Sequence, residues 1–128
     1  MRIAMAQINS TVGDLKGNAE KIIEYIEEAK RHKADLVMFP ELAVTGYPPQ
    51  DLLYEESFVR ESRELLEKIV RESTGIITVV GFVDHNPGRK GSDGTEVKYN
   101  AAAVIQNGKL VGVQYKTLLP TYDVFDED

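Results

Sequence analysis

The chain has 128 residues, and its 15 lysines and arginines against 21 aspartates and glutamates give a formal charge of −6 at pH 7. That length fits one domain, which we expect to fold without stabilisation by a metal ion or a disulfide bond. The acidic balance argues against nucleic acid or an anionic membrane surface as a partner, because both repel an acidic domain. No apolar run approaches the roughly 20 residues that span a bilayer, and the first residues turn polar too soon for a signal peptide. We therefore expect a cytoplasmic protein.

The chain contains no cysteine. This excludes disulfides, thiolate metal sites and a thiol nucleophile within these 128 residues.

Short apolar runs alternate with amphipathic segments over residues 3–83. Residues 3–8 and 36–39 read as strands buried on both faces, and residues 76–83 as a third. Between the first two, apolar residues recur at helical spacing from Ala19 to Ala29, with Asn18 as a plausible cap and Glu20 in the first turn. A second helix is predicted after a loop that runs from Pro40 to about Glu55, with an apolar face formed by Phe58, Val59, Ser62, Leu65, Leu66, Ile69 and Val70.

The remaining elements are a loop and a hairpin. Residues 84–96 are polar, contain three glycines and a proline, and predict a mobile surface loop. Strands at 97–106 and 109–115 flank Asn107-Gly108, a strong hairpin signal. Three strands joined by two helices and followed by an antiparallel hairpin predict an α/β fold with a mixed sheet.

Two charged residues follow predicted strands. Glu41 comes directly after residues 36–39, and ligands of α/β sheets gather beyond the carboxyl ends of strands. With Pro40 stiffening the backbone and apolar neighbours on either side, it can act as a general base with a raised pKa. Lys116 follows the last predicted strand and can place a fixed charge against an oxyanion. A solvated loop glutamate and a surface lysine are the alternatives.

Other candidate sites are weaker. The proline-rich loop at 46–53 can hold Tyr47 as the wall of a pocket, or can simply be a tight helix entry. The acidic end at 122–128 lacks the spacing and glycine of a calcium loop and reads as solvated. The only histidines, His32 and His85, are too few for a zinc site, and we expect no metal in this chain.

Four segments together resemble the nitrilase superfamily. They are residues 39–42 (FPEL), 45–53 (TGYPPQDLL), 99–102 (YNAA) and 115–127 (YKTLLPTYDVFDE). More narrowly, the second and fourth are similar to the N-terminal glutaminase domain of glutamine-dependent NAD⁺ synthetases. The resemblance covers essentially the whole chain. It implies the first half of a nitrilase-type α-β-β-α sandwich, so residues 1–128 form the N-terminal part of one domain, with no second domain present.

The resemblance also implies a Glu–Lys–Cys triad. By motif, Glu41 corresponds to the general base and Lys116 to the lysine that stabilises the tetrahedral intermediate. Glu127 matches a supporting glutamate that orients the site, and Tyr122 lies where a glutamine-binding tyrosine is found. A cysteine thiolate attacks the side-chain amide of glutamine, ammonia leaves, and water hydrolyses the thioester to glutamate. In the whole enzyme the ammonia amidates deamido-NAD⁺ at a synthetase domain, where ATP and Mg²⁺ are expected. No cofactor is expected in this chain.

The family's cysteine lies after the Lys motif, beyond Asp128. We therefore predict that this chain alone does not hydrolyse glutamine. Half a sandwich also leaves an apolar sheet face uncovered, so we expect self-association, or cover from the missing half of the domain. Two other functions remain open: a nitrilase-type amidase acting on N-carbamoyl or aliphatic amides, and a non-catalytic structural or interaction module.

Overall fold

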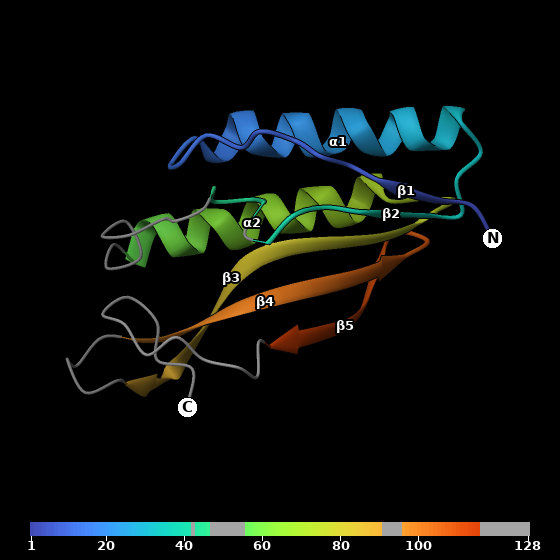
Figure 1. Cartoon of the computed structure of the whole chain (residues 1–128). Helices are drawn as coiled ribbons and strands as arrows, with labels where there is room; N and C mark the ends of the chain where they lie inside the picture. Colours follow the sequence, from blue (N-terminus) through green and yellow to red (C-terminus); the bar gives the residue numbers. More distant parts are fainter. Residues whose placement is uncertain (42, 47–55, 91–95, 116–128) are drawn as a thin grey trace.

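The computed structural model describes residues 1–41, 43–46, 56–90 and 96–115. Over these residues the chain forms five strands and two helices (Figure 1). In chain order they are β1 (Ile3–Met5), α1 (Leu15–Arg31), β2 (Leu36–Met38), α2 (Glu56–Glu72), β3 (Ile77–Lys90), β4 (Glu96–Gln106) and β5 (Lys109–Tyr115).

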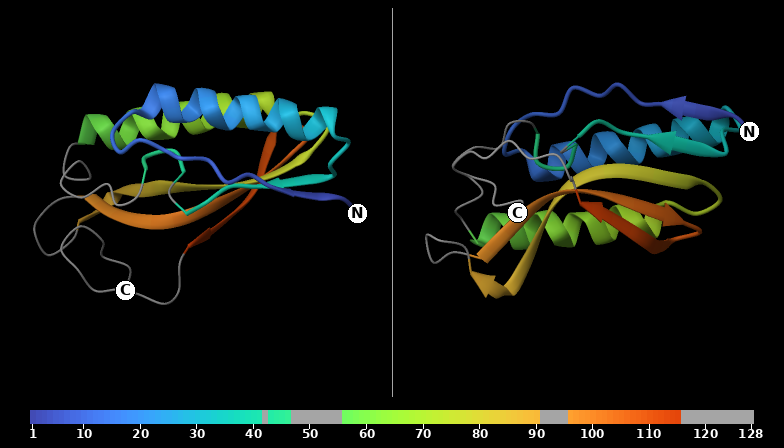
Figure 2. Two further views of the ribbon diagram at one scale, coloured as in Figure 1. Left: turned by 45° about the horizontal axis from the view of Figure 1, so that its top comes forward. Right: turned by 60° about the horizontal axis from the view of Figure 1, so that its bottom comes forward.

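The strands form a single mixed sheet in the order β1-β2-β3-β4-β5. The first three strands are parallel, and β4 and β5 are antiparallel to their neighbours. Right-handed crossovers that step in the same direction across a sheet place their helices on one face. Both helices accordingly lie over the same face of the sheet (Figures 1 and 2). The α/β class and the mixed sheet are as predicted.

The core lies between the helices and this face of the sheet. The residues of this core alternate along β3 and β4, as the period of a strand requires, and recur at helical spacing on α1 and α2. The largest fully buried side chains are Ile22, Ile26, Val37, Val44, Val59, Leu66, Ile69, Val80, Phe82 and Ile105. Among the described residues, no helix combines the length and apolarity that crossing a membrane requires.

The start of α1 differs from the prediction. The helix begins at Leu15, and its cap is Asp14, whose carboxylate accepts a hydrogen bond from the backbone N–H of Gly17 at 3.1 Å. Glu20 therefore lies beyond the first turn, which contains no acidic residue. Asn18 is fully buried inside the helix and bonds to a neighbouring loop instead. The prediction failed because Gly17, a poor helix former, lies in the first turn and interrupts the helical sequence pattern there.

Residues 84–96 also differ from the prediction of a loop. β3 continues to Lys90, and β4 already begins at Glu96, so that Asp84 pairs with Tyr99 and Asn86 with Val97. The antiparallel ladder satisfies the backbone groups of both strands, and polar side chains do not prevent such pairing. Only residues 91–95 fall outside the described residues of this segment.

The β4–β5 hairpin forms as predicted. Asn107 and Gly108 both have positive φ angles, 52° and 75°, which a tight primed hairpin turn requires. Gly108 N–H donates to the carbonyl of Ser73 at 3.0 Å, and this bond ties the turn to the residue that follows α2.

The first strand is shorter and more exposed than predicted. It ends at Met5 and lies at the edge of the sheet, not buried on both faces. Ala4 packs against the core, whereas Ile3 and Met5 are 53% and 72% exposed on the other face. The paired residue Met38 of β2 is also exposed on that face. Within the described residues, no helix covers this apolar face (Figure 2).

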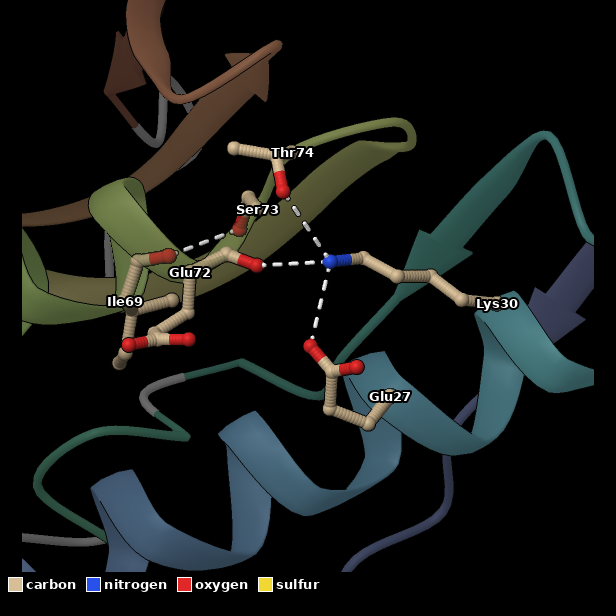
Figure 3. A network of polar contacts seen from close by, with 6 residues as sticks. All are labelled: Glu27, Lys30, Ile69, Glu72, Ser73 and Thr74. Carbon is tan, nitrogen blue, oxygen red and sulfur yellow. Dashed lines mark hydrogen bonds and ion pairs between the residues drawn. The ribbon is translucent and has the colours of Figure 1, made fainter.

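Lys30 connects the ends of the two helices (Figure 3). Its Nζ donates to the carboxylate of Glu27 at 3.1 Å and to the main-chain carbonyl of Glu72, the last residue of α2, at 3.0 Å. A cation beside the last carbonyls of a helix is favourable, because those carbonyls have no partner within the helix and carry the negative end of its dipole.

Candidate active site

Glu41 lies just beyond the carboxyl end of β2, where the sequence predicts a catalytic carboxylate. The buried ring of Phe39 precedes it, and the backbone N–H of Phe39 bonds to the carbonyl of Val79 on β3 at 2.9 Å. Glu41 itself is exposed in a turn. Its Oε1 accepts a hydrogen bond from Nδ2 of Asn100 on β4. The contact therefore joins the turn after β2 to strand β4, two parts of the chain that are far apart in the sequence.

Asn100 is a buried polar residue in an otherwise apolar part of β4. Asn100 is only 6% exposed. It lies next to Ala101, and its backbone pairs with Val83 of β3. A buried amide needs a partner to offset its desolvation. The Glu41 carboxylate is that partner, and an ionised carboxylate is a strong acceptor. The arrangement holds one oxygen of Glu41 in a defined place.

A second buried amide, Asn18 on α1, fixes the segment that follows Glu41. Its Nδ2 donates to the carbonyls of Thr11 and Val44, at 2.8 and 3.0 Å. Its Oδ1 accepts from the N–H of Thr11 at 2.8 Å. The N–H of Val44 bonds to the carbonyl of Gly81 on β3 at 3.2 Å. The loop after β2 is thereby tied to the first helix, to the loop after β1 and to the centre of the sheet.

Gly46 allows the two loops to meet closely. Its φ is +81°, and a Cβ at this position would lie 2.7 Å from Cα and 2.8 Å from N of Val12. The N–H of Gly13 donates to the carbonyl of Thr45 at 3.0 Å, and the Ser10 hydroxyl donates to the carbonyl of Ala43 at 2.7 Å. Only glycine combines this backbone conformation with so close an approach.

A polar cluster lies at the far end of β5. The carboxylate of Asp84 on β3 accepts from Nη1 of Arg63 on α2 and from the hydroxyl of Tyr115, each at 2.9 Å. The rings of Tyr115 and Tyr99 stack with their centroids 4.6 Å apart. Partial burial, followed by the hydrogen bond and the negative charge of Asp84, raises the pKa of Tyr115.

This cluster lies beside the strand position of Asn100. Tyr115 pairs with Ala101, the residue next to Asn100. Tyr115 is also the last residue of β5, directly before Lys116. Asn100, the partner of Glu41, is therefore one position along β4 from the residue that pairs with the end of β5.

The other predicted site residues lie outside the described residues. They are Tyr47, Lys116, Tyr122 and Glu127. Their proposed roles stay predictions. Within the described ranges, no three or more His, Asp or Glu side chains gather in a way that could hold a metal ion.

Sequence reasoning missed the roles of Asn100 and Asp84. The segment 99–102 carries the family resemblance but predicts no contact for Asn100, and the polar composition predicts a loop that begins at Asp84. The available signal was a polar residue at a position where the strand is otherwise apolar, since such a residue needs a buried partner. The identity of that partner depends on strand pairing over long sequence separations, which the pattern does not reveal.

Comparison with known proteins agrees with this fold. The profile of the carbon-nitrogen hydrolase family matches residues 2–127. A glutamine-dependent NAD(+) synthetase from Thermotoga maritima is 42% identical over an alignment of 129 residues, which covers 99% of this chain and 21% of the relative. The chain therefore spans about a fifth of the length of the synthetases that it matches.

Solved structures show the same likeness. A glutamine-dependent NAD(+) synthetase from Cytophaga hutchinsonii superposes with a TM-score of 0.84 at 28% identity, over 94% of this chain and 20% of that one. An amidase from Nesterenkonia sp. AN1, described with acrylamide added at its active-site cysteine, has a TM-score of 0.75 at 25% identity, over 95% of this chain and 46% of that one. Since the family profile covers nearly every residue and the fold agrees, the chain belongs to the carbon-nitrogen hydrolase family, the nitrilase superfamily.

Proposed function

We propose that this chain is the first half of a glutaminase domain, which hydrolyses the side-chain amide of glutamine and supplies ammonia for the ATP-dependent amidation of deamido-NAD⁺. The observation that carries the proposal is 42% identity to a glutamine-dependent NAD(+) synthetase over 99% of the chain. The position of Glu41 beyond β2, held by Asn100, supports it.

In this proposal Glu41 is the general base. It takes the proton from a cysteine thiol, and the thiolate attacks the amide carbon of glutamine. Lys116 stabilises the negative oxygen of the tetrahedral intermediate, and Glu127 supports the site. The carbon-nitrogen bond breaks as the departing amino group takes the proton back from Glu41 and leaves as ammonia. Glu41 then takes a proton from water, the resulting hydroxide attacks the thioester, and the cysteine sulfur leaves with that proton as glutamate is released. Tyr122 and Tyr47 are proposed to contact the substrate.

The cysteine must come from outside these 128 residues, because none is present in them. We therefore propose that the remainder of the domain is the chain's principal partner and that the 128 residues alone are inactive. We propose no cofactor for this part. ATP and Mg²⁺ would act at a synthetase domain, which lies outside this chain.

The test is ammonia release from glutamine by a protein that contains the complete domain. Glu41→Gln and Lys116→Ala should each lower kcat by at least about 10²-fold, as expected for loss of a general base or an oxyanion donor. The 128-residue chain should release no ammonia. Wild-type kcat in either variant, or turnover by the 128 residues, would contradict the assignment.

The likeness to the Nesterenkonia amidase favours a second candidate, a nitrilase-type amidase for another substrate. Both candidates use the same residues and differ in the amide that is bound. A panel of glutamine, N-carbamoyl amino acids and aliphatic amides, assayed with the complete domain, separates them by kcat/KM. The glutaminase proposal fails if glutamine is the poorest of the three.

A further inference from the structure

We propose that Asp84 is a positioning residue of the active site, which acts through Tyr115 to fix the end of β5, one residue before Lys116 in the sequence. The inference rests on the proposed function, because it assigns Lys116 a role in catalysis. The residues that carry it, on α2, β3, β4 and β5, all belong to the described part of the chain.

Both oxygens of the Asp84 carboxylate are engaged by donors from different elements. Oδ1 accepts from Arg63 on α2, and Oδ2 accepts from the Tyr115 hydroxyl on β5, each at 2.9 Å. Asp84 is 8% exposed, so its charge is largely removed from water. Charge-assisted bonds in such a setting are stronger and more directional than those between neutral groups.

The donors on either side are themselves held in place. The Tyr115 ring stacks on Tyr99 at 4.6 Å with the planes 18° apart, and the Arg63 guanidinium lies 5.6 Å from the centre of the Phe82 ring. Tyr115 therefore has its ring fixed by a stacking partner and its hydroxyl fixed by a carboxylate. These contacts join β5 to β3 across the intervening strand β4.

The end of β5 needs such an anchor. Within the described sheet, β5 pairs only with β4, and five of its seven residues are exposed. An edge strand of this kind has few buried contacts to keep its last residue in one place. A catalytic amine, by contrast, must be held within a fraction of an ångström, because a misplacement of about 1 Å can reduce the rate about 10²-fold. The Asp84–Tyr115 bond supplies that restraint one residue before Lys116.

The experiment compares Tyr115→Phe and Asp84→Asn in a protein that contains the complete domain. Tyr115→Phe retains the stacking ring and removes only the hydroxyl donor. Asp84→Asn retains the shape and can still accept from Arg63 through its remaining oxygen, but its NH₂ group replaces the oxygen that accepts from Tyr115, so the charge-assisted bond from the phenol is lost. We expect kcat to fall about 10-fold in each variant, with KM within about twofold of wild type, since an amine that acts on the intermediate does not bind the ground state.

Two further measurements separate positioning from stability. The double variant should be no slower than the slower single variant, because both changes break the same bond. Amide hydrogen exchange at residues 113–115 should become about 10-fold faster in both variants, whereas the unfolding midpoint changes little. Tyr25→Phe is the matched control, because Tyr25 on α1 has nearly the same exposure, 41% against 42%, and lies outside the cluster. It should leave both readouts unchanged.

Unaltered kcat together with unaltered exchange at residues 113–115 would overturn the proposal. So would a fall in kcat that tracks a fall in the unfolding midpoint. The exchange measurement does not depend on the substrate, so a domain that prefers another amide would refute the glutaminase assignment and leave the test of Asp84 intact. In that case the kinetic comparison uses the preferred amide.

Discussion

The side-chain amide of Asn100 donates a hydrogen bond to the carboxylate of Glu41 and joins the centre of β4 to the turn that follows β2. The two residues are 59 positions apart in the sequence. Because Asn100 is buried and lies on a strand, it provides a rigid support for a side chain that extends from a turn.

Asn100→Ala should therefore impair the general base without removing it. We expect kcat for amide hydrolysis by the complete domain to fall about 10-fold, less than the 10²–10⁴-fold that a general base typically contributes. Asn100→Asp should be at least as impaired, since it places a second carboxylate against Glu41. Gln106→Ala, which changes an exposed amide at the end of the same strand, is the control. Full activity in Asn100→Ala would show that Glu41 needs no support from β4.

Gly46 and Gly75 form a matched pair for a test of the contact between the first two loops. Both have positive φ, +81° and +74°, but a Cβ would meet the Val12 backbone at Gly46 and nothing within 4 Å at Gly75. Gly75→Ala should cost about 1–2 kcal/mol, the strain of the left-handed conformation alone. Gly46→Ala should cost about 3 kcal/mol or more, because the loops must also separate. Urea unfolding measures both, and equal losses would contradict the close approach.

Asn18→Ala tests the hydrogen bonds by which the buried side chain of Asn18 holds the segment after Glu41. The change leaves three main-chain groups, the N–H and carbonyl of Thr11 and the carbonyl of Val44, without their side-chain partner. At about 1 kcal/mol or more for each lost bond, we expect the free energy of unfolding to fall by about 3 kcal/mol. Asn9→Ala, at an exposed position, should change it by less than about 0.5 kcal/mol. Similar changes in the free energy of unfolding for the two variants would show that water replaces the hydrogen bonds of Asn18.

Local pattern predicted most of the elements, because each depends on residues close together in sequence. The apolar face of α2 and the Asn107-Gly108 turn are examples, since helical spacing and two adjacent turn residues define them. The location of Glu41 was also predictable, from an apolar run that ends in a charged residue. The partners of Glu41 and Asp84 were not, because they depend on strand register and on the position of α2 over the sheet.

Two of the incorrect boundaries, the start of α1 and the segment 84–96, have a different cause. Polar composition predicted a loop where β3 and β4 continue to pair, since the ladder needs only backbone groups. Asn18 resembled a cap because its residue type is common there, but its buried amide serves the loops instead. In both cases a tertiary contact outweighed a residue preference.

The uncovered face of the sheet predicts how the 128-residue chain behaves in isolation. Ile3, Met5 and Met38 expose apolar surface on the face opposite the helices, because Ala4 and Val37 beside them point into the core. We expect the isolated chain to bind a hydrophobic dye and to sediment as more than a monomer, because extended apolar patches associate. Met5→Lys should reduce both, whereas Tyr25→Lys, on the helix layer, should not. A dye-free monomer would show that the face is already covered.

The raised pKa of Tyr115 predicts a change of stability at alkaline pH. In the folded protein burial and the Asp84 carboxylate favour the neutral phenol, so its pKa lies above the ordinary value near 10. Above that pH the unfolded chain releases a proton that the folded chain still retains, and stability falls as pH rises through the folded pKa. The contribution is fully present below about pH 10. Tyr115→Phe removes this titration, so its free energy of unfolding, measured in urea from pH 9 to 11, should fall less steeply than that of wild type. A constant offset between the two curves would indicate a lost hydrogen bond without a shifted pKa, and would contradict the interaction between the phenol and Asp84.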